Sequence, residues 1–270
     1  MIALTIAGSD SGGGAGIQAD LKTFSALGVY GASAITAITA QNTRGVSAVH
    51  ALPADIVLAQ LDAVLSDIDV KAIKIGMLGD PALIAELAAR LRRETIPIVL
   101  DTVMVAASGD RLVPEAAMDA IRTELLPHAT LITPNIPEAA ALLDEPAAAD
   151  TDALATQAHR LAALGPAVLA KGGHLTDAQS VDVLVTGEAE ERFSAPRTDT
   201  RNTHGTGCTL SSAIAAFLAR GLALPDAVRE GKAYVSGAIA SADALQVGHG
   251  HGPVHHFHRL WPHVDGLAPR

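Results

Sequence analysis

The sequence predicts an α/β domain with a mostly parallel central sheet, helices on both faces and an antiparallel pair of strands at one edge. Three observations support this fold class. Short, almost continuous apolar runs, typical of strands buried on both faces, recur along the chain. They alternate with longer helical patterns, as in sheets covered on both sides. Two later runs flank Gly187 and have the pattern of a hairpin.

The predicted elements follow one another without a linker long enough to divide the chain, so we expect a single domain over residues 1–270. Pro81 and Pro114 stand near helix starts, where a missing N–H costs little. The predicted strands are 2–7, 32–39, 72–75, 98–100, 131–133 and 167–170, with the hairpin at 181–186 and 192–195. The predicted helices are 16–26, 54–66, 81–93, 114–126, 137–143, 152–164, 210–220 and 225–245.

Composition excludes several functions. A formal charge of -10 and an aromatic content of 3% argue against nucleic acid as a partner, because the charge repels phosphate and few rings are available for stacking. No apolar run is long enough to span a membrane, and the N-terminus lacks a basic leader, so we expect no membrane partner. The single cysteine fits a reducing compartment, and we expect a cytoplasmic protein.

A glycine-rich turn runs into the predicted helix 210–220 and predicts an anion site. The first amides of a helix have no partner within it, and glycine lets an anion approach them. We therefore expect Gly205, Thr206, Gly207 and Cys208 to hold a phosphoryl group in transit. Cys208 lies in the first turn, where a thiol is more easily deprotonated, and is the candidate base. The alternative is a capped helix with a buried cysteine.

Polar or glycine residues follow six predicted strands. In a parallel sheet these positions share one edge, where ligands bind. They are Gly8, Gln41 with Asn42, Gly76 with Met77, Asp101, Asn135 with Glu138 one turn later, and Lys171.

The loop Ser11–Gly16 resembles two nucleotide motifs but completes neither. The acid expected about 20 residues after a dinucleotide fingerprint is missing, and Gly14 stands where a P-loop has lysine. We expect the loop to let backbone approach a small substrate, with a tight strand–helix turn as the alternative. Asp20, one turn later, is either a substrate contact or an acid favoured by the helix dipole.

Asp101, Asn135 and Glu138 supply hard oxygen atoms beside the predicted phosphate site. Magnesium is often held by one or two carboxylates together with nucleotide phosphates and water. We therefore expect these three residues to hold Mg²⁺, although Glu138 alone would be an ordinary first-turn carboxylate. Lys171 would neutralise phosphate charge, with a structural ion pair as the alternative.

Five histidines fall within residues 248–258 and raise the possibility of a zinc site. The segment is rich in glycine and holds no cysteine or carboxylate. We therefore expect an ordered loop that packs back over the edge of the sheet.

Several of these motifs together resemble the ribokinase-like superfamily, and more closely the hydroxymethylpyrimidine/phosphomethylpyrimidine kinases of thiamine biosynthesis. The similarity extends from Ala7 to about His258. It is carried by the segments 7–22, 40–43, 74–78, 100–104, 133–138, 171–174 and 204–209.

The resemblance implies a three-layer sandwich without a separate lid domain, and a homodimer. It implies two successive transfers from ATP, first to the hydroxymethyl oxygen of 4-amino-5-hydroxymethyl-2-methylpyrimidine and then to the monophosphate. Cys208 stands where many superfamily members carry an aspartate base. By position, Gly8, Asp20, Gln41, Met77 and Val103 would line the pyrimidine pocket, whereas Lys171, Asn135 and Thr203 would contact the nucleotide.

Three alternative functions remain open from the sequence. A pyridoxine or pyridoxal kinase would act on a similar hydroxymethyl group. A non-catalytic pyrimidine-binding protein would keep the pocket without the reaction. A cysteine acyl-transfer enzyme would use Cys208 as its nucleophile, with His204 close in sequence.

Overall fold

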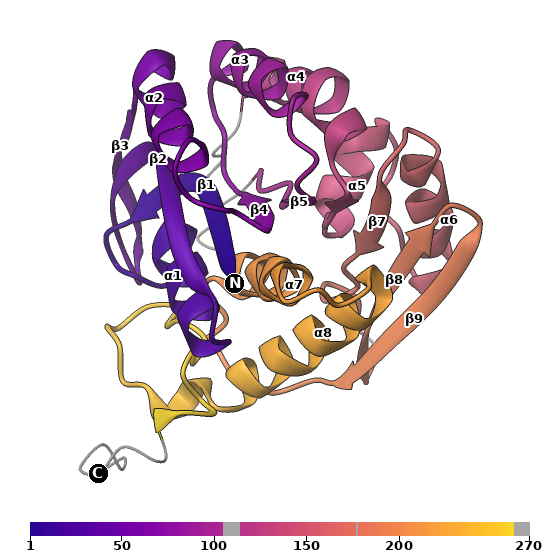
Figure 1. Cartoon of the computed structure of the whole chain (residues 1–270). Coiled ribbons are helices and arrows are strands. Elements are labelled where there is room, and N and C mark those ends of the chain that lie inside the picture. The colour runs from indigo at the N-terminus through magenta and orange to yellow at the C-terminus, as the bar shows by residue number, and fades with distance from the viewer. Residues whose placement is uncertain (105–113, 177, 262–270) are drawn as a thin grey trace.

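A computed structural model describes residues 1–104, 114–176 and 178–261. One nine-stranded sheet runs through it in the order β3-β2-β1-β4-β5-β6-β7-β8-β9 (Figure 1). The six strands from β2 to β7 are parallel, and β8 and β9 form the predicted antiparallel edge. The strands are β1 (Ile2–Asp10), β2 (Tyr30–Asn42), β3 (Gly45–Ala51), β4 (Ala72–Ile75), β5 (Ile98–Leu100), β6 (Leu131–Ile132), β7 (Ala167–Ala170), β8 (Gln179–Thr186) and β9 (Ala189–Pro196).

The opposite edge carries a second antiparallel pair that the sequence did not predict. Strand β3 pairs antiparallel with β2, from Asn42↔Gly45 to Ala37↔Ala51. Most of its residues are exposed, and the segment lacks the continuous apolar run by which the buried strands were recognised.

Helices cover both faces, so the predicted three-layer arrangement is confirmed (Figure 1). One apolar core lies between the sheet and α2 to α6, and a second lies between the sheet and α1, α7 and α8. The helices are α1 (Gly16–Ala26), α2 (Ala54–Leu65), α3 (Pro81–Leu91), α4 (Glu115–Ala120), α5 (Ile136–Leu143), α6 (Thr151–Ala162), α7 (Thr206–Ala219) and α8 (Leu224–Ala240). Within the described ranges, none combines the length and apolar character needed to cross a membrane.

Three helices differ from their predicted bounds by more than two residues. The predicted helix 114–126 is α4 followed by a π-helical turn, Ile121–Leu125, and a 3₁₀ turn, Leu126–His128. Helix α8 ends at Ala240 rather than 245, and a 3₁₀ turn follows at Ala242–Ala244. Helix α7 begins at Thr206, four residues before the predicted start, because glycine and threonine in the first turn weaken the apolar pattern without preventing helix formation.

Candidate active site

The N-terminus of α7 forms a turn that requires glycine. Gly205 is the N-cap residue and has φ 79°, a left-handed conformation that glycine adopts readily. A Cβ at this position would lie 1.8 Å from the carbonyl oxygen of Gly14. Thr206, Gly207 and Cys208 follow as the first three residues of the helix, so their amides have no acceptor from a preceding helical turn. The predicted anion-binding turn is therefore a helix N-terminus.

Asp101 and Lys171 meet beside this turn. They immediately follow β5 and β7, and Lys171 Nζ lies 3.2 Å from Asp101 Oδ1. A Cβ on Gly207 would lie 3.4 Å from Lys171 Nζ and 3.7 Å from Asp101 Oδ2. The structure thus brings together the helix amides, an ammonium and a carboxylate. Asp101 also accepts hydrogen bonds from two hydroxyls, those of Thr133 and Ser211.

Asn135 and Glu138 form a capping box at the start of α5. Asn135 Oδ1 accepts from the Glu138 amide at 2.9 Å, and Glu138 Oε2 accepts from the Asn135 amide at 2.8 Å. Glu138 Oε2 also accepts from Thr102 Oγ1 at 3.2 Å and lies 3.8 Å from Lys171 Nζ. The Glu138 side chain that caps the helix therefore also lies beside the lysine.

Burial and charge shift the two carboxyl groups in opposite directions. Burial raises the pKa of Glu138 to about 7, and the positive charge of Lys171 only partly offsets this effect. Burial also raises the pKa of Asp101, but Lys171 and Lys74 outweigh it, so the pKa of Asp101 lies below its usual value. Asp101 is therefore the more firmly charged carboxylate of the pair.

The donor set fits a magnesium ion bound largely through water. Lys171 Nζ already faces Asp101 and Glu138, and Asn135 Oδ1 serves as a helix cap. Carboxylates that pair with a lysine can still accept hydrogen bonds from the water ligands that Mg²⁺ retains. Outside the gaps at 105–113, 177 and 262–270, no group of three or more His, Cys, Asp or Glu residues could hold a metal ion directly.

The predicted ease of deprotonating Cys208 is wrong. Burial raises the pKa of its thiol to about 11, and the positive charge of Lys74 only partly opposes this shift. Desolvation of the thiolate thus changes the pKa more than the favourable position of Cys208 in the first helical turn does. A thiol that keeps its proton at neutral pH is a poor base and a poor nucleophile, which counts against the acyl-transfer alternative.

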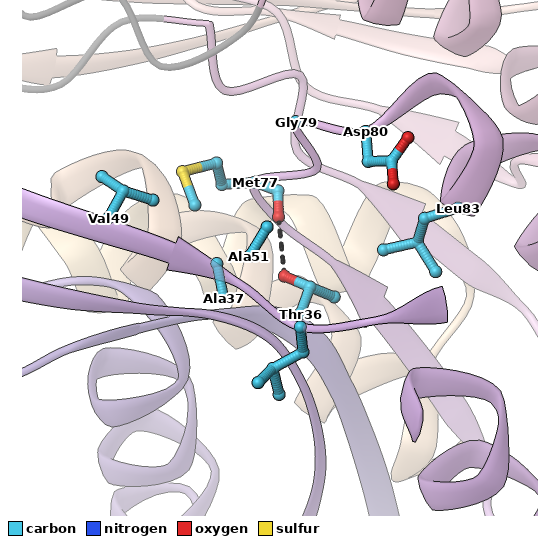
Figure 2. A pocket seen from close by; sticks show the side chains of 9 residues that line it. Thr36, Ala37, Val49, Ala51, Met77, Gly79, Asp80 and Leu83 are labelled. Carbon is cyan, nitrogen blue, oxygen red and sulfur yellow. Dashed lines mark hydrogen bonds between the residues drawn. The ribbon is translucent and has the colours of Figure 1, made fainter. Parts of the chain in front are cut away.

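Gly8, Met77 and Gln41 lie at neighbouring ends of β1, β4 and β2. A Cβ on Gly8 would lie 2.8 Å from the terminal methyl group of Met77, so the thioether packs directly on the glycine. Met77 lines a cleft with a volume of about 210 Å³. Figure 2 shows the Thr36 hydroxyl in this cleft, where it donates to the Met77 carbonyl. Val103 is half-buried and follows Asp101, whose carbonyl accepts from the Val103 amide.

The structure places Asp20 inside the protein, where it is fully buried. Its carboxylate accepts from Thr5 Oγ1 and Ser212 Oγ, each at 2.6 Å, and pairs with Lys74 Nζ at 2.9 Å. Both oxygens are therefore occupied by protein groups, in place of the predicted contact with substrate. The first-turn alternative is also wrong, because Asp20 is the fifth residue of α1.

Lys74 was missed as a site residue by the sequence analysis. It is fully buried in β4, a strand of sequence Ala-Ile-Lys-Ile. A lysine in the middle of such a short apolar strand is itself a signal, because a buried ammonium needs a partner.

Asp10 organises the glycine-rich loop and was also missed. It is the last residue of β1, and its carboxylate accepts from the amides of Gly12, Gly14 and Ala15 at 2.8, 3.0 and 2.8 Å. The same carboxylate lies 2.9 Å from His204 Nε2. The loop is thus attached to the residue that precedes the α7 turn.

The histidine-rich segment 248–258 packs along the sheet edge, as predicted. The His251 amide donates to the carbonyl of Thr43, and the Val254 amide donates to that of His204. His256 Nε2 lies 3.1 Å from Thr209 Oγ1, and burial lowers the pKa of His256 to about 3. The segment thus covers one side of the α7 turn with neutral polar groups. Thr203, the remaining predicted nucleotide contact, is exposed and accepts from the Thr206 amide.

A family model described as phosphomethylpyrimidine kinase matches residues 10–255. The chain belongs to the phosphomethylpyrimidine kinase family. It is therefore a phosphotransferase, and the α7 turn is the candidate site for this chemistry. This membership also excludes the reading of a protein that only binds pyrimidines.

Known proteins of this family are similar in sequence to this chain over most of its length. It is 57% identical to the hydroxymethylpyrimidine/phosphomethylpyrimidine kinase of Escherichia coli, over 96% of this chain and 98% of that protein. It is 51% identical to the thiamine biosynthesis bifunctional protein ThiED of Geobacter sulfurreducens, over 94% of this chain and 51% of that protein.

Solved structures extend the similarity to the fold. The phosphomethylpyrimidine kinase of Clostridium difficile has a TM-score of 0.79 and 44% identity, over 88% of this chain and 99% of that one. The pyridoxal kinase of Bacillus subtilis, in an ADP complex, has a TM-score of 0.88 and 37% identity, over 96% of this chain and 98% of that one. The ribokinase-like architecture predicted from the sequence is therefore confirmed.

Proposed function

We propose that this protein transfers a phosphoryl group from ATP to the hydroxymethyl oxygen of 4-amino-5-hydroxymethyl-2-methylpyrimidine, and then a second one to the monophosphate, for thiamine biosynthesis. The observation that carries the proposal is the meeting of Gly207, Lys171 and Asp101 within one site. Phosphoryl transfer needs positioning and charge neutralisation more than covalent chemistry from the protein. Helix amides and an ammonium supply both.

The residues divide into two sides of the site. The amides of Gly205, Gly207 and Cys208 hold the transferred phosphoryl group, and Lys171 neutralises the charge of that group. Thr206 belongs to the same turn, but its amide donates to the Thr203 carbonyl. On the other side Gly8, Gln41, Met77 and Val103 contact the pyrimidine ring. Asp20 is held by Lys74, whose Nζ would lie 2.8 Å from a Cβ on Gly76, the residue before Met77. Thr203 and Asn135 lie on the nucleotide side.

Mg²⁺ would be held by Asp101 and Glu138, with Asn135 beside them, through its water ligands. Bound there, the ion neutralises negative charge that develops on the phosphate oxygens. Asp101 and Glu138 would orient those waters. The positive charge of Lys171 offsets the repulsion between the two carboxylates.

The test is ADP release, measured with the hydroxymethylpyrimidine and with pyridoxal as acceptors. We expect rapid turnover of the pyrimidine and slower turnover of pyridoxal. Similarity to the Bacillus subtilis pyridoxal kinase favours pyridoxal kinase as the second candidate. Faster turnover of pyridoxal would reverse this assignment. A cytoplasmic homodimer is part of the proposal, and light scattering of the purified protein tests the dimer.

We expect Cys208 to orient the substrate hydroxyl while keeping its own proton. A group whose pKa is about 11 is almost entirely protonated between pH 7.5 and 9. Cys208→Ala should therefore lower kcat roughly tenfold by loosening the hydroxyl, and by the same factor at every pH. Cys208→Ser, which keeps a hydrogen-bonding group, should be milder. The measurement is kcat of all three proteins over this pH range.

A base role predicts a different pH dependence. The thiolate fraction, and with it the advantage of the wild type over Cys208→Ala, would rise tenfold for each pH unit below 11. Such a slope would contradict the positioning role.

We expect Glu138→Gln to raise the Mg²⁺ concentration needed for half-maximal rate by about tenfold or more, because loss of a group that orients the metal's ligands commonly has such an effect. Glu86→Gln is the matched control, since Glu86 is an exposed residue of α3. The measurement is a magnesium titration at fixed ATP. Equal magnesium requirements in both variants would remove Glu138 from the metal site.

A further inference from the structure

Gln41, Thr39, His204 and Asp10 form a chain of polar contacts between the glycine-rich loop and the predicted pyrimidine pocket. The Nε2 position of Gln41 lies 3.4 Å from His204 Nε2, and its Oε1 position lies 3.2 Å from Thr39 Oγ1. The nitrogen and oxygen of a carboxamide are assigned from their hydrogen-bond partners. Here the partners determine which way the amide faces.

Asp10 determines which ring nitrogen of His204 carries a proton. Burial raises the pKa of the Asp10 carboxyl, but hydrogen bonds from His204, Ala15 and Gly12 outweigh it, so that pKa lies below its usual value. An ionised carboxylate only accepts hydrogen bonds. Since His204 Nε2 lies 2.9 Å from Asp10 Oδ2, this nitrogen carries a proton and donates it. It cannot accept from Gln41, so an amide N–H of Gln41 facing His204 would find no acceptor there, whereas the amide oxygen can share the Nε2 proton with Asp10.

Thr39 leads to the same orientation independently. Its hydroxyl has one proton, which is directed to the carbonyl oxygen of Ser9 at 2.8 Å. The hydroxyl therefore offers Gln41 only a lone pair, and the group of Gln41 that faces Thr39 must be a donor. One rotation of the carboxamide, with its oxygen toward His204 and its nitrogen toward Thr39, satisfies both contacts.

We propose that His204 and Thr39 are positioning residues that fix the orientation of the Gln41 carboxamide and thereby select the amino form of the substrate ring. The fixed amide retains one free N–H and one free lone pair in a set order. A 4-aminopyrimidine presents an exocyclic donor beside a ring acceptor, whereas the 4-oxo form presents an acceptor beside a ring donor. An amide that cannot rotate pairs with one of these edges and leaves buried polar groups unpaired with the other.

Gly14 and the segment 252–254 hold His204 in place for this task. A Cβ on Gly14 would lie 2.4 Å from His204 Cδ2, so the loop backbone packs against the imidazole. The His204 amide and carbonyl both bond to the segment 252–254. The imidazole is buried on all these sides, which leaves it little freedom to follow a rotated Gln41.

The inference rests on the proposed function, and the experiment compares two ring chemistries. ADP release is measured with 4-amino-5-hydroxymethyl-2-methylpyrimidine and with its 4-oxo analogue. We expect the wild type to favour the amino compound in kcat/KM by roughly 10- to 100-fold. His204→Leu removes the donor, and we expect this preference to fall to about threefold or less, mainly through KM.

Three further variants make the result specific. His204→Gln keeps an N–H donor on a side chain of similar reach and should preserve the preference. Thr39→Val removes the other partner of the amide and should reduce it, which keeps the test decisive if His204→Leu does not fold. His255→Leu is the control, because His255 is a buried histidine of the tail whose Nδ1 has no hydrogen-bond partner among the described residues. It should leave the preference unchanged.

The failures are distinguishable. An unchanged preference in folded His204→Leu and Thr39→Val, or equal use of both compounds by the wild type, would overturn the inference and leave the proposed function standing. No ADP release by the wild type with either pyrimidine would overturn the proposed function itself.

Discussion

Replacing Lys74 with methionine should lower the free energy of unfolding by about 3–5 kcal/mol, the usual cost of leaving a buried charge without its partner. Lys74 Nζ lies 3.0 and 2.9 Å from the two oxygens of Asp20, and both side chains are fully buried. Burial lowers the pKa of Lys74, but the charge of Asp20 outweighs it, so the pKa lies above its usual value and the ammonium stays charged. Among the described residues, methionine would leave the carboxylate with the hydroxyls of Thr5 and Ser212 as its side-chain donors.

Urea unfolding of the wild type and three variants measures the effect. Lys71→Met is the matched control, because Lys71 pairs with Asp69 at 2.6 Å while 52% and 78% of the side chains are exposed. A surface pair contributes only about 0–1 kcal/mol. The double variant Lys74→Met with Asp20→Asn removes both charges and should recover part of the loss. A Lys74→Met protein as stable as Lys71→Met would show that the pair contributes nothing.

The sequence predicts the edge of the sheet well, for a geometric reason. Residues that follow parallel strands must lie at the same edge, so Asp101 and Lys171 could be placed together without knowing any side-chain contact. The start of α7 was less predictable. Apolar periodicity marks only the buried part of a helix, and the first turn from Thr206 is half-buried and largely polar.

The errors concern residues whose environment is made by distant segments. Asp20 was interpreted from its place in one helix, but its partners come from β1, β4 and α7. The first-turn argument for Cys208 considered the amides of its own helix and not the desolvation that raises its pKa. Both interpretations fail because burial is a property of packing, which local sequence does not contain.

Replacing Lys171 with methionine should lower kcat by about 10²–10³-fold, the usual effect of removing one preorganised donor from developing negative charge. Lys171 is the cation beside Gly207, and a Cβ there would lie 3.4 Å from Nζ. Its charge acts on the phosphoryl group rather than on the pyrimidine ring, so KM for the pyrimidine should change much less. The measurement is steady-state ADP release at saturating ATP.

A loss of activity through unfolding must be separated from a loss of charge neutralisation. Methionine removes the ammonium that pairs with Asp101 and leaves the hydrogen bonds from Thr133 and Ser211, so some destabilisation is expected. The folded fraction is therefore measured by urea titration beside each rate. Lys171→Arg keeps the charge but changes its geometry, and it should retain more activity than Lys171→Met. If the folded methionine variant turned over within about threefold of the wild type, an anion site formed by the helix amides alone would be sufficient, and the lysine would be a structural partner of Asp101.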